Sequence, residues 1–507
     1  MQTLEKTEPK LAELKTRLTE IDDVDSAAAL LYWDQVTYMP SAGAVARSRQ
    51  LATLRQISHT KFIDPSLGEL LEDLKTYEAS LPYDSDDASL IRITRRNYER
   101  AVRVPVEFMA RISQHRAEAY HAWAKAKNAE DFSIVRPYLE KTLDLSRELS
   151  SFYPGYDHVA DPLIDRADYG ITASSLKQLF ADLRQQLIPI VDAIAAQPAA
   201  DVSCLCQLFP EAEQWQLTLQ LLQLMGYDFQ RGRQDKTLHP FTINFSIDDV
   251  RITTRVREND LTEAVFSSIH EMGHAFYEQG SDKAFEATPL AGGVSSGVHE
   301  SQSRLWENIV ARSRPFWRYF YPKLQARFPQ QFKQVDLETF YRAINNVQRS
   351  LIRTDADEVT YNLHVAIRFD LELAMLEGHL AIRDLPDAWN ERYSNDLGVI
   401  PKTDREGVLQ DVHWYSDTIG GRFQGYTLGN LMSAQVFEAA TKALPDIPTQ
   451  IEQGNFSPLR QWLQRSIYQH GCKYTPAELI EQVTGNTLGI APFIRYIQSK
   501  YGELYTL

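Results

Sequence analysis

Two histidines and a glutamate between residues 260 and 280 have the spacing of a metal-dependent hydrolase. His270, Glu271 and His274 stand in the order H-E-x-x-H. On a helix, which turns by about 100° per residue, the two imidazoles lie one turn apart on the same face and reach one ion. Two neutral nitrogens are suited to hold Zn²⁺, while the adjacent carboxylate takes a proton from the water that the ion activates. The pattern therefore predicts a zinc-type hydrolytic site.

A catalytic zinc site needs a third protein ligand and an open fourth position. Glu278 lies about 12 Å along the helix axis from His270, which is too far to share a tetrahedral ion with it. The next candidates follow a Gly/Ser-rich segment and belong to a helix predicted over 298–311; they are His299, Glu300 and Glu307. Glu300 lies near the N-terminal end of that helix and can be aimed from it at the first helix, but spacing alone cannot choose between Glu300 and its neighbour His299.

Several ordered segments of the chain resemble the carboxypeptidase Taq family of metallocarboxypeptidases. The H-E-x-x-H motif is followed by His299-Glu300-Ser301-Gln302, as in that family. The other segments that carry the resemblance are Leu31-Tyr32-Trp33-Asp34-Gln35 with Met39-Pro40, His239-Pro240-Phe241, Asp249-Val250-Arg251-Ile252-Thr253, Ile352-Arg353-Thr354-Asp355-Ala356-Asp357, and Gly407 to Trp414. The resemblance runs from about residue 20 to the C-terminus, and ordered motifs are more specific than one motif alone.

The resemblance implies a complete metal site. His270, His274 and Glu300 would bind the metal, and Glu271 would be the general base and acid. One Zn²⁺ ion per chain is expected, although two imidazoles and a carboxylate also accept Co²⁺ or Mn²⁺. The resemblance further implies a mainly α-helical fold with a deep groove, related to neurolysin and the angiotensin-converting enzymes, and a homodimer.

A carboxypeptidase must recognise the free C-terminal carboxylate, and bidentate arginine is suited to that task. The resemblance implies Arg353 for this role. The alternative is a bridge from Arg353 to Asp357, four residues on in a helix predicted over 354–377. Arg251 is a second candidate cation, but a pair with Asp249 inside a hairpin is the preferred interpretation.

The resemblance also assigns side chains to the groove opposite the metal helix. His413 and Tyr426 are candidate donors to the oxyanion that develops on the cleaved carbonyl. His239 is a candidate substrate-groove residue, and Asp357 is a candidate for orienting a metal-bound imidazole.

One departure from the family pattern precedes Tyr426. Relatives usually have Pro-Thr where this chain has Gln424-Gly425. Replacing Pro-Thr by Gln-Gly exchanges a backbone with a fixed φ angle for a freer one. The resemblance therefore predicts the position of Tyr426 less closely than that of the metal ligands.

Helical periodicity dominates the elements that must position these residues. Leu11, Leu14, Leu18 and Ile21 form one apolar stripe on a charged first helix. Similar patterns predict helices over 87–127, 135–152, 174–197, 261–279 and 354–377. For the helix that carries the metal motif, Asp260 followed by Glu263 favours a start and Gly280 favours a stop.

The segment 241–256 is the strongest strand signal. It alternates, is rich in β-branched residues and is split by Asp248-Asp249, so it predicts a short hairpin. Although 507 residues correspond to a soft prior of about three domains, we find no internal repeat or long linker. We therefore expect one mainly α-helical catalytic domain over 1–507, with the helical part of the groove at about 1–200 and the metal and substrate site at about 239–430.

Composition excludes several other classes of protein. The chain has 53 Lys and Arg against 68 Asp and Glu, a net charge of −15, which disfavours nucleic acid as the main partner. Its three cysteines, Cys204, Cys206 and Cys472, are too few for a disulfide framework and are expected to be reduced thiols. The charged N-terminus lacks the apolar core of a signal peptide, and no apolar stretch approaches the roughly 18 residues of a membrane helix. A cytoplasmic location is expected.

Together these features predict a metal-dependent carboxypeptidase of broad specificity that releases single residues from peptides with a free C-terminus. An endo-acting metallo-oligopeptidase on the same fold is the nearest alternative. A metal-binding protein that has lost catalysis is a second alternative, against which the presence of Glu271 argues.

Overall fold

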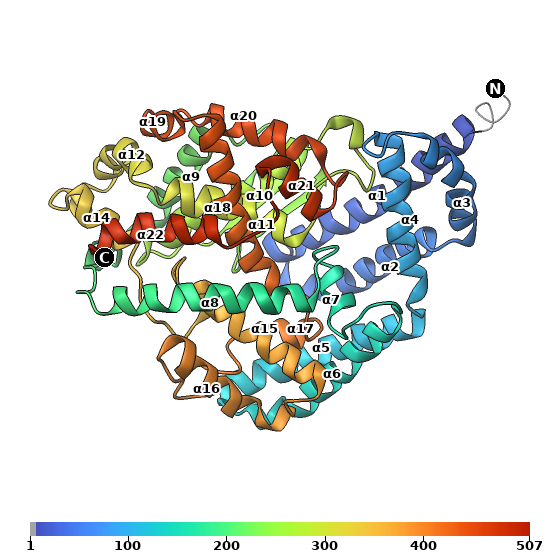
Figure 1. Cartoon of the computed structure of the whole chain (residues 1–507), viewed down its shortest axis with the longest axis horizontal. Helices are drawn as coiled ribbons and strands as arrows, with labels where there is room; N and C mark the ends of the chain where they lie inside the picture. Colours follow the sequence, from blue (N-terminus) through green and yellow to red (C-terminus); the bar gives the residue numbers. More distant parts are fainter. Residues whose placement is uncertain (1–6) are drawn as a thin grey trace.

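The computed structural model describes residues 7–507, and its N-terminal helices gather at one end of the molecule (Figure 1). These helices are α1 (Thr7–Thr37), α2 (Ala44–Phe62), α3 (Pro65–Ser80) and α4 (Asp86–Arg103). On α1, Leu14, Leu18 and Ile21 are buried as the stripe predicts, while Leu11 is half-buried. Leu14 and Leu18 pack with leucines of α3 in a small core of their own.

Five more helices follow in the middle of the chain. They are α5 (Val106–Ala129), α6 (Arg136–Ser151), α7 (Asp161–Asp165), α8 (Ala173–Ala195) and α9 (Glu211–Met225). The periodic segment 87–127 divides between α4 and α5, because Pro105 lacks an amide hydrogen and favours extended backbone at the preceding Val104. In the view of Figure 1, α8 runs along the middle of the molecule.

A three-stranded sheet contains the predicted hairpin. Its strands are β1 (Gln234–Lys236), β2 (Thr242–Ser246) and β3 (Asp249–Thr254), in the order β1-β3-β2. Strands β2 and β3 are antiparallel, with Ile243 opposite Arg251, which confirms the hairpin. Strand β1 pairs with β3 in parallel; it has three residues, too few to show an alternating pattern in the sequence.

The metal motif lies on α10 (Leu261–Gly280), which packs against β3 and against α11 (Ser296–Arg304). The Asp260 carboxylate accepts hydrogen bonds from the amides of Thr262 and Glu263, so the predicted start is confirmed. Glu263 does not complete a capping box, because its carboxylate binds Arg255. After α11 the backbone continues as a π-helix, η5 (Leu305–Ala311), so the expected helix over 298–311 changes its pitch at residue 305.

The cap of α10 leads to a stability prediction. We expect Asp260→Ala to lower the free energy of unfolding by about 1 kcal/mol, because two amides at the start of the helix lose their acceptor. Asp446→Ala is the matched control, since Asp446 stands at the same position before α19 without making a side-chain cap bond. Urea unfolding followed by circular dichroism measures both; equal changes in the two variants would contradict the assigned role of Asp260.

The C-terminal half adds the remaining helices. They are α12 (Arg314–Arg327), α13 (Pro329–Phe332), α14 (Leu337–Ile344), α15 (Tyr361–Glu377), α16 (Leu385–Leu397), α17 (His413–Ser416), α18 (Gln424–Ala443), α19 (Ile447–Glu452), α20 (Ser457–Ser466), α21 (Pro476–Thr484) and α22 (Ala491–Tyr505). The helix expected over 354–377 begins later, at Tyr361. Its start is delayed because Asp357 accepts hydrogen bonds from the amides of Val359 and Thr360 in a turn before the helix.

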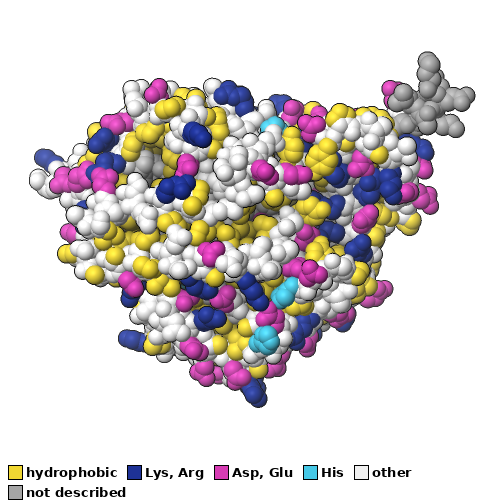
Figure 2. Space-filling view, viewed as in Figure 1, with side chains coloured by type: hydrophobic (Ala, Val, Ile, Leu, Met, Phe, Trp, Pro, Cys, Tyr) yellow, Lys and Arg dark blue, Asp and Glu magenta, His cyan; other side chains and the backbone are white. Residues whose placement is uncertain are grey.

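Helix α18 ties these parts together by packing against α11, α15 and α22. One large apolar core contains side chains from α5 to α22, so the molecule is a single, mainly helical body with a small sheet, as expected. None of the helices within residues 7–507 has the length and apolar character needed to cross a membrane. On the face in Figure 2, basic and acidic side chains are intermixed instead of forming one large charged field.

Candidate active site

His270, His274 and Glu300 direct three ligand atoms toward one point. Oε2 of Glu300 is 3.3 Å from Nε2 of His274 and 3.7 Å from Nε2 of His270. The ligand atoms of all three residues lie within 4.8 Å of one another. Ligands of a tetrahedral zinc ion are separated by about 3.3 Å. The donor set and its spacing therefore fit a divalent metal with one coordination position left for water or substrate.

Two glycines allow Glu300 to approach the histidines. A Cβ atom on Gly273, inside the motif on α10, would lie 2.5 Å from Cα of Ser303 on α11. A Cβ atom on Gly429, on α18, would lie 2.5 Å from Cγ of Glu300. Helix α11 is thus held between two surfaces that have no side chain at the point of contact, and this close packing brings its carboxylate to α10.

Hydrogen bonds to the outer nitrogens of the imidazoles orient both rings. The Nδ1 atom of His270 is 2.9 Å from Oε2 of Glu307. The Nδ1 atoms of His274 and His299 are 2.5 Å apart, and Nε2 of His299 is 2.6 Å from Oε1 of Glu278. If His299 donates to Glu278, its Nδ1 accepts a hydrogen from His274. Both metal-facing Nε2 atoms then keep a free lone pair, which metal binding requires.

The third ligand is held as a carboxylate. Oε1 of Glu300 accepts a hydrogen bond of 2.7 Å from Arg304, so Oε2 remains for the metal. Burial alone would raise the pKa of Glu300, but Arg304 and His270 hold it well below its usual range. For His274, burial lowers the pKa to about 3, which keeps the imidazole neutral. Both protonation states are those of metal ligands.

Glu271 stands beside the metal ligands without joining them. Its Oε2 accepts a hydrogen bond of 2.7 Å from the hydroxyl of Thr242 on β2. Its Oε1 accepts no hydrogen bond from any residue in the described range 7–507. Burial raises the pKa of Glu271, although His270 and Thr242 act in the opposite direction. A buried carboxylate with one free oxygen next to the metal position is suited to proton transfer.

A cavity of about 600 Å³ opens onto this group. His274 and Glu300 line it, and so do His413 and Tyr426 from the C-terminal segment. Nε2 of His413 is 3.3 Å from the hydroxyl of Tyr426. Burial lowers the pKa of His413 to about 4 and raises the pKa of Tyr426 to about 12, so both side chains are neutral at pH 7. The cavity therefore has two of the three metal ligands and a pair of neutral hydrogen-bonding side chains in its wall.

A family model described as carboxypeptidase Taq (M32) metallopeptidase matches residues 13–501. The chain belongs to this family. It is accordingly a metallocarboxypeptidase, and the resemblance found in its motifs is confirmed.

The similarity to individual family members covers at least 95% of both chains. Thermostable carboxypeptidase 1 of Thermus thermophilus is 40% identical over 95% of this chain and 96% of its own. Carboxypeptidase 1 of Bacillus subtilis is 37% identical over 97% of each. The crystal structure of an M32 carboxypeptidase from Deinococcus radiodurans superposes with a TM-score of 0.96 at 46% identity, covering 98% of this chain and all of that one.

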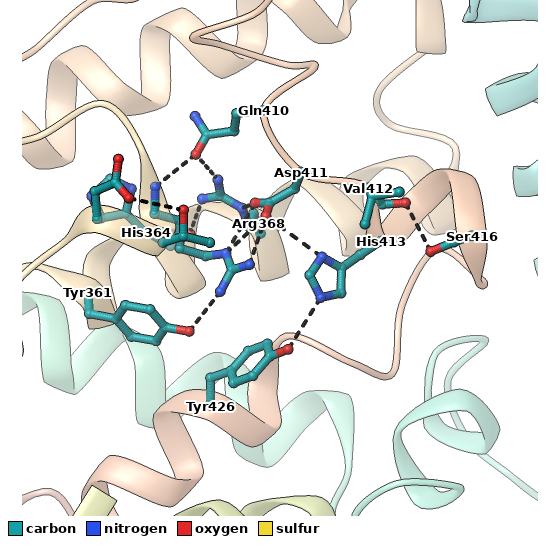
Figure 3. A network of polar contacts seen from close by, with 12 residues as sticks. Tyr361, His364, Arg368, Gln410, Asp411, Val412, His413, Ser416 and Tyr426 are labelled. Atoms are coloured by element: carbon teal, nitrogen blue, oxygen red, sulfur yellow. Dashed lines mark hydrogen bonds and ion pairs between the residues drawn. The ribbon is translucent and has the colours of Figure 1, made fainter. Parts of the chain in front are cut away.

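Arg353 lies one layer behind the cavity wall of this carboxypeptidase. It is 5% exposed and binds Asp411 through Nε and Nη2, while Nη1 donates to Tyr361. Arg368 binds the same aspartate at 2.5 Å, and Figure 3 shows Asp411 between Arg368 and His413. Burial alone would raise the pKa of Asp411, but Arg368 and Arg353 hold it well below its usual range. Two guanidinium groups thus share one carboxylate and leave one positive charge behind His413.

Asp357 has neither of the two roles considered for it. Its carboxylate binds the amides of Gln348, Val359 and Thr360 and contacts neither Arg353 nor a metal-site histidine. Glu307 orients His270 instead. From the sequence, Glu307 is expected only as a competing ligand. A signal for it was available, because Glu307 follows Glu300 by seven residues and so returns to the same helix face.

The remaining predicted residues are not among the three convergent ligands. His239 is exposed in the loop between β1 and β2 and is not among the residues that line the cavity. Arg251 pairs with Asp249 at 2.7 Å, which confirms the preferred interpretation of a hairpin pair. His299 and Glu278 form the hydrogen-bonded chain behind His274.

The Gln424-Gly425 departure leaves Tyr426 in the cavity. Gln424 is buried and donates a hydrogen bond of 3.2 Å to Asp168. Gln424 and Gly425 both have helical backbone, in the first turn of α18. A Cβ atom at Gly425 would lie 3.2 Å from Cβ of Ser296. Close contact with the start of α11, rather than backbone freedom, is what this glycine provides.

Proposed function

We propose that this metallocarboxypeptidase releases single residues of broad type from peptides with a free C-terminus, with Glu271 as general base and acid. The observation that carries the proposal is the convergence of three ligand atoms next to a cavity, with the buried carboxylate of Glu271 following His270 directly on the same helix. When bound, a divalent metal would polarise the scissile carbonyl and acidify the attacking water. Zn²⁺ is the ion we propose, since two imidazoles and a carboxylate are a typical catalytic zinc set, with Co²⁺ or Mn²⁺ as substitutes.

Proton transfer is assigned to Glu271, and stabilisation of the developing negative charge is assigned to two side chains of the cavity wall. The free oxygen of Glu271 would take a proton from the attacking water and return it to the leaving amine. His413 and Tyr426, both neutral, would donate hydrogen bonds to the oxygen on which negative charge develops. Their shared position in the cavity wall supports this role.

Recognition of the substrate C-terminus is proposed for Arg353. The excess positive charge that Arg353 and Arg368 leave over Asp411 supports it, since it lies directly behind His413. His239 belongs to the proposal only as an outer residue that an extended peptide would meet, because it is exposed outside the cavity.

Three broader expectations complete the proposal. We propose that residues 1–507 act as one catalytic domain, which agrees with the contribution of both Arg166 and Tyr426 to one cavity. A homodimer is proposed on the family resemblance. A cytoplasmic location is proposed on the three scattered cysteines, all of which are free thiols.

A single peptide in two forms tests the activity. We expect the metal-loaded protein to shorten the free-acid form stepwise from its C-terminus and to leave the C-terminally amidated form uncut, because the amide removes the negative charge that the excess positive charge at Arg353 would attract. Mass spectrometry of the digests, with a chelator-treated control, gives the result. Internal cuts in both forms would favour the endo-acting oligopeptidase, and absence of metal-dependent cleavage would favour a binding protein.

A further inference from the structure

Three guanidinium groups share one carboxylate at the edge of the active-site cavity. Asp417 is 2.5 Å from Nη2 of Arg116, 2.9 Å from Nε of Arg422 and 3.3 Å from Nη2 of Arg166. These arginines come from α5, from the end of α7 and from the loop before α18, so the fold brings them together from distant parts of the chain. The three arginines and one aspartate together have a net charge of +2, whereas an isolated ion pair is neutral.

The excess charge faces the cavity. Arg166 and Arg422 both line it, together with His274 and Glu300, and their side chains are 43% and 53% exposed. Arg422 uses only Nε for Asp417, and its two Nη groups have no hydrogen-bond partner within residues 7–507. Arg166 likewise uses only Nη2. Several charged donors therefore remain available to a molecule in the cavity.

No other charged side chain that lines the cavity competes for these donors. Glu300 is the only carboxylate among the lining residues, and it belongs to the metal site. Arg353 is a separate cation, since it is buried against Asp411 and does not line the cavity. The cavity wall thus has no negatively charged side chain that would neutralise Arg166 and Arg422, and an anionic group of a bound molecule could do so.

We propose that Arg166 and Arg422 form a subsite for the side-chain carboxylate of an aspartate or glutamate next to the scissile bond of the substrate. This inference rests on the proposed function, which supplies a peptide in the cavity. An unmodified peptide offers carboxylates at its C-terminus and on its acidic side chains. Because the C-terminal carboxylate is assigned to Arg353, the acidic side chain is the group left for the second cationic pair. Substrates with an acidic residue at this point are therefore preferred over their neutral isosteres.

Matched pairs of blocked peptides test the preference. One pair has Glu or Gln as the released residue, and the other has Glu or Gln immediately before the scissile bond. We expect kcat/KM of the wild-type protein to be about tenfold higher for the Glu peptide in at least one pair, because a charge-assisted hydrogen bond replaces a neutral one. Raising the salt concentration reduces this ratio, since both arginines are partly exposed to solvent.

Variants connect the ratio to the two arginines. Arg422→Gln and Arg166→Gln each move the Glu-to-Gln ratio toward one, and Arg422→Lys retains part of it. Arg383→Gln is the control, because Arg383 is an exposed arginine paired with Asp384 that does not line the cavity; it keeps the wild-type ratio.

Each other outcome overturns the subsite. A wild-type Glu-to-Gln ratio of kcat/KM near or below one in both pairs would show that there is no preference for an acidic residue. A ratio that stays at the wild-type value in both arginine variants would show that the two arginines do not cause the preference. An equal loss on Glu and Gln peptides means that the pair binds the C-terminal carboxylate instead. Because the Gln peptides report cleavage independently, a failed ratio leaves the proposed function standing, whereas a protein that cleaves neither Glu nor Gln peptides overturns both.

Discussion

Replacing Glu271 by glutamine is expected to lower kcat by about 10³-fold, within the range attributed to general acid–base catalysis. The amide keeps the volume of the side chain and still accepts the hydrogen bond from Thr242, but it can no longer take a proton from water. Because Glu271 is not one of the three convergent ligands, the metal content should remain that of the wild-type protein. Steady-state kinetics on a blocked peptide and metal analysis of the same samples measure the two quantities.

Glu263→Gln is the matched control for this variant. Glu263 lies on the same helix but in its first turn, where it pairs with Arg255 away from the metal ligands. It should keep wild-type turnover. A Glu271→Gln protein with full metal content and nearly normal kcat would assign the base to another group.

Replacing Glu300 by alanine is expected to weaken metal binding by more than about 100-fold, because loss of a residue that only orients a ligand already costs about 10–100-fold. The two imidazoles alone offer an incomplete set of donors. The loss also frees Arg304 from the 2.7 Å contact with Glu300 and directs an extra positive charge toward the ion. Competition with a chelator gives the affinity, and elemental analysis identifies the ion that is retained.

Glu307→Gln separates the loss of a ligand from the loss of an orienting group. It removes the carboxylate that holds Nδ1 of His270 but leaves all three ligand atoms in place. Its affinity for the metal should fall less than that of Glu300→Ala. Unchanged metal content in Glu300→Ala would exclude Glu300 as the third ligand and direct attention to His299.

Local pattern was enough to predict several elements of this fold. The stripe on α1, the Asp260 cap of α10 and the hairpin of β2 and β3 are all present as expected. Each depends on residues close in sequence, whose periodicity or capping chemistry acts within one element. The late start of α15 was missed because a single carboxylate, Asp357, competes for the amides of the first turn.

The third metal ligand was predicted only in part from local sequence. Spacing along the chain left Glu300, His299 and Glu307 as alternatives, and the family resemblance selected Glu300. In the structure Gly273 and Gly429 let α11 approach α10 and α18, so that the Glu300 carboxylate meets both imidazoles. The other two candidates bind the outer nitrogens of the same rings.

The sequence by itself determined that two imidazoles and a carboxylate stand on one helix, because four residues along an α-helix return a side chain to the same face. Only the tertiary structure decided which charges meet at the cavity and directly behind its wall. It buries Arg353 against Asp411 and brings Arg166 and Arg422 to the cavity from segments about 250 residues apart. Packing between distant elements sets these contacts, and local spacing along the chain does not predict it. A charged side chain that leaves water needs a partner of opposite charge, and that partner can come from any part of the chain.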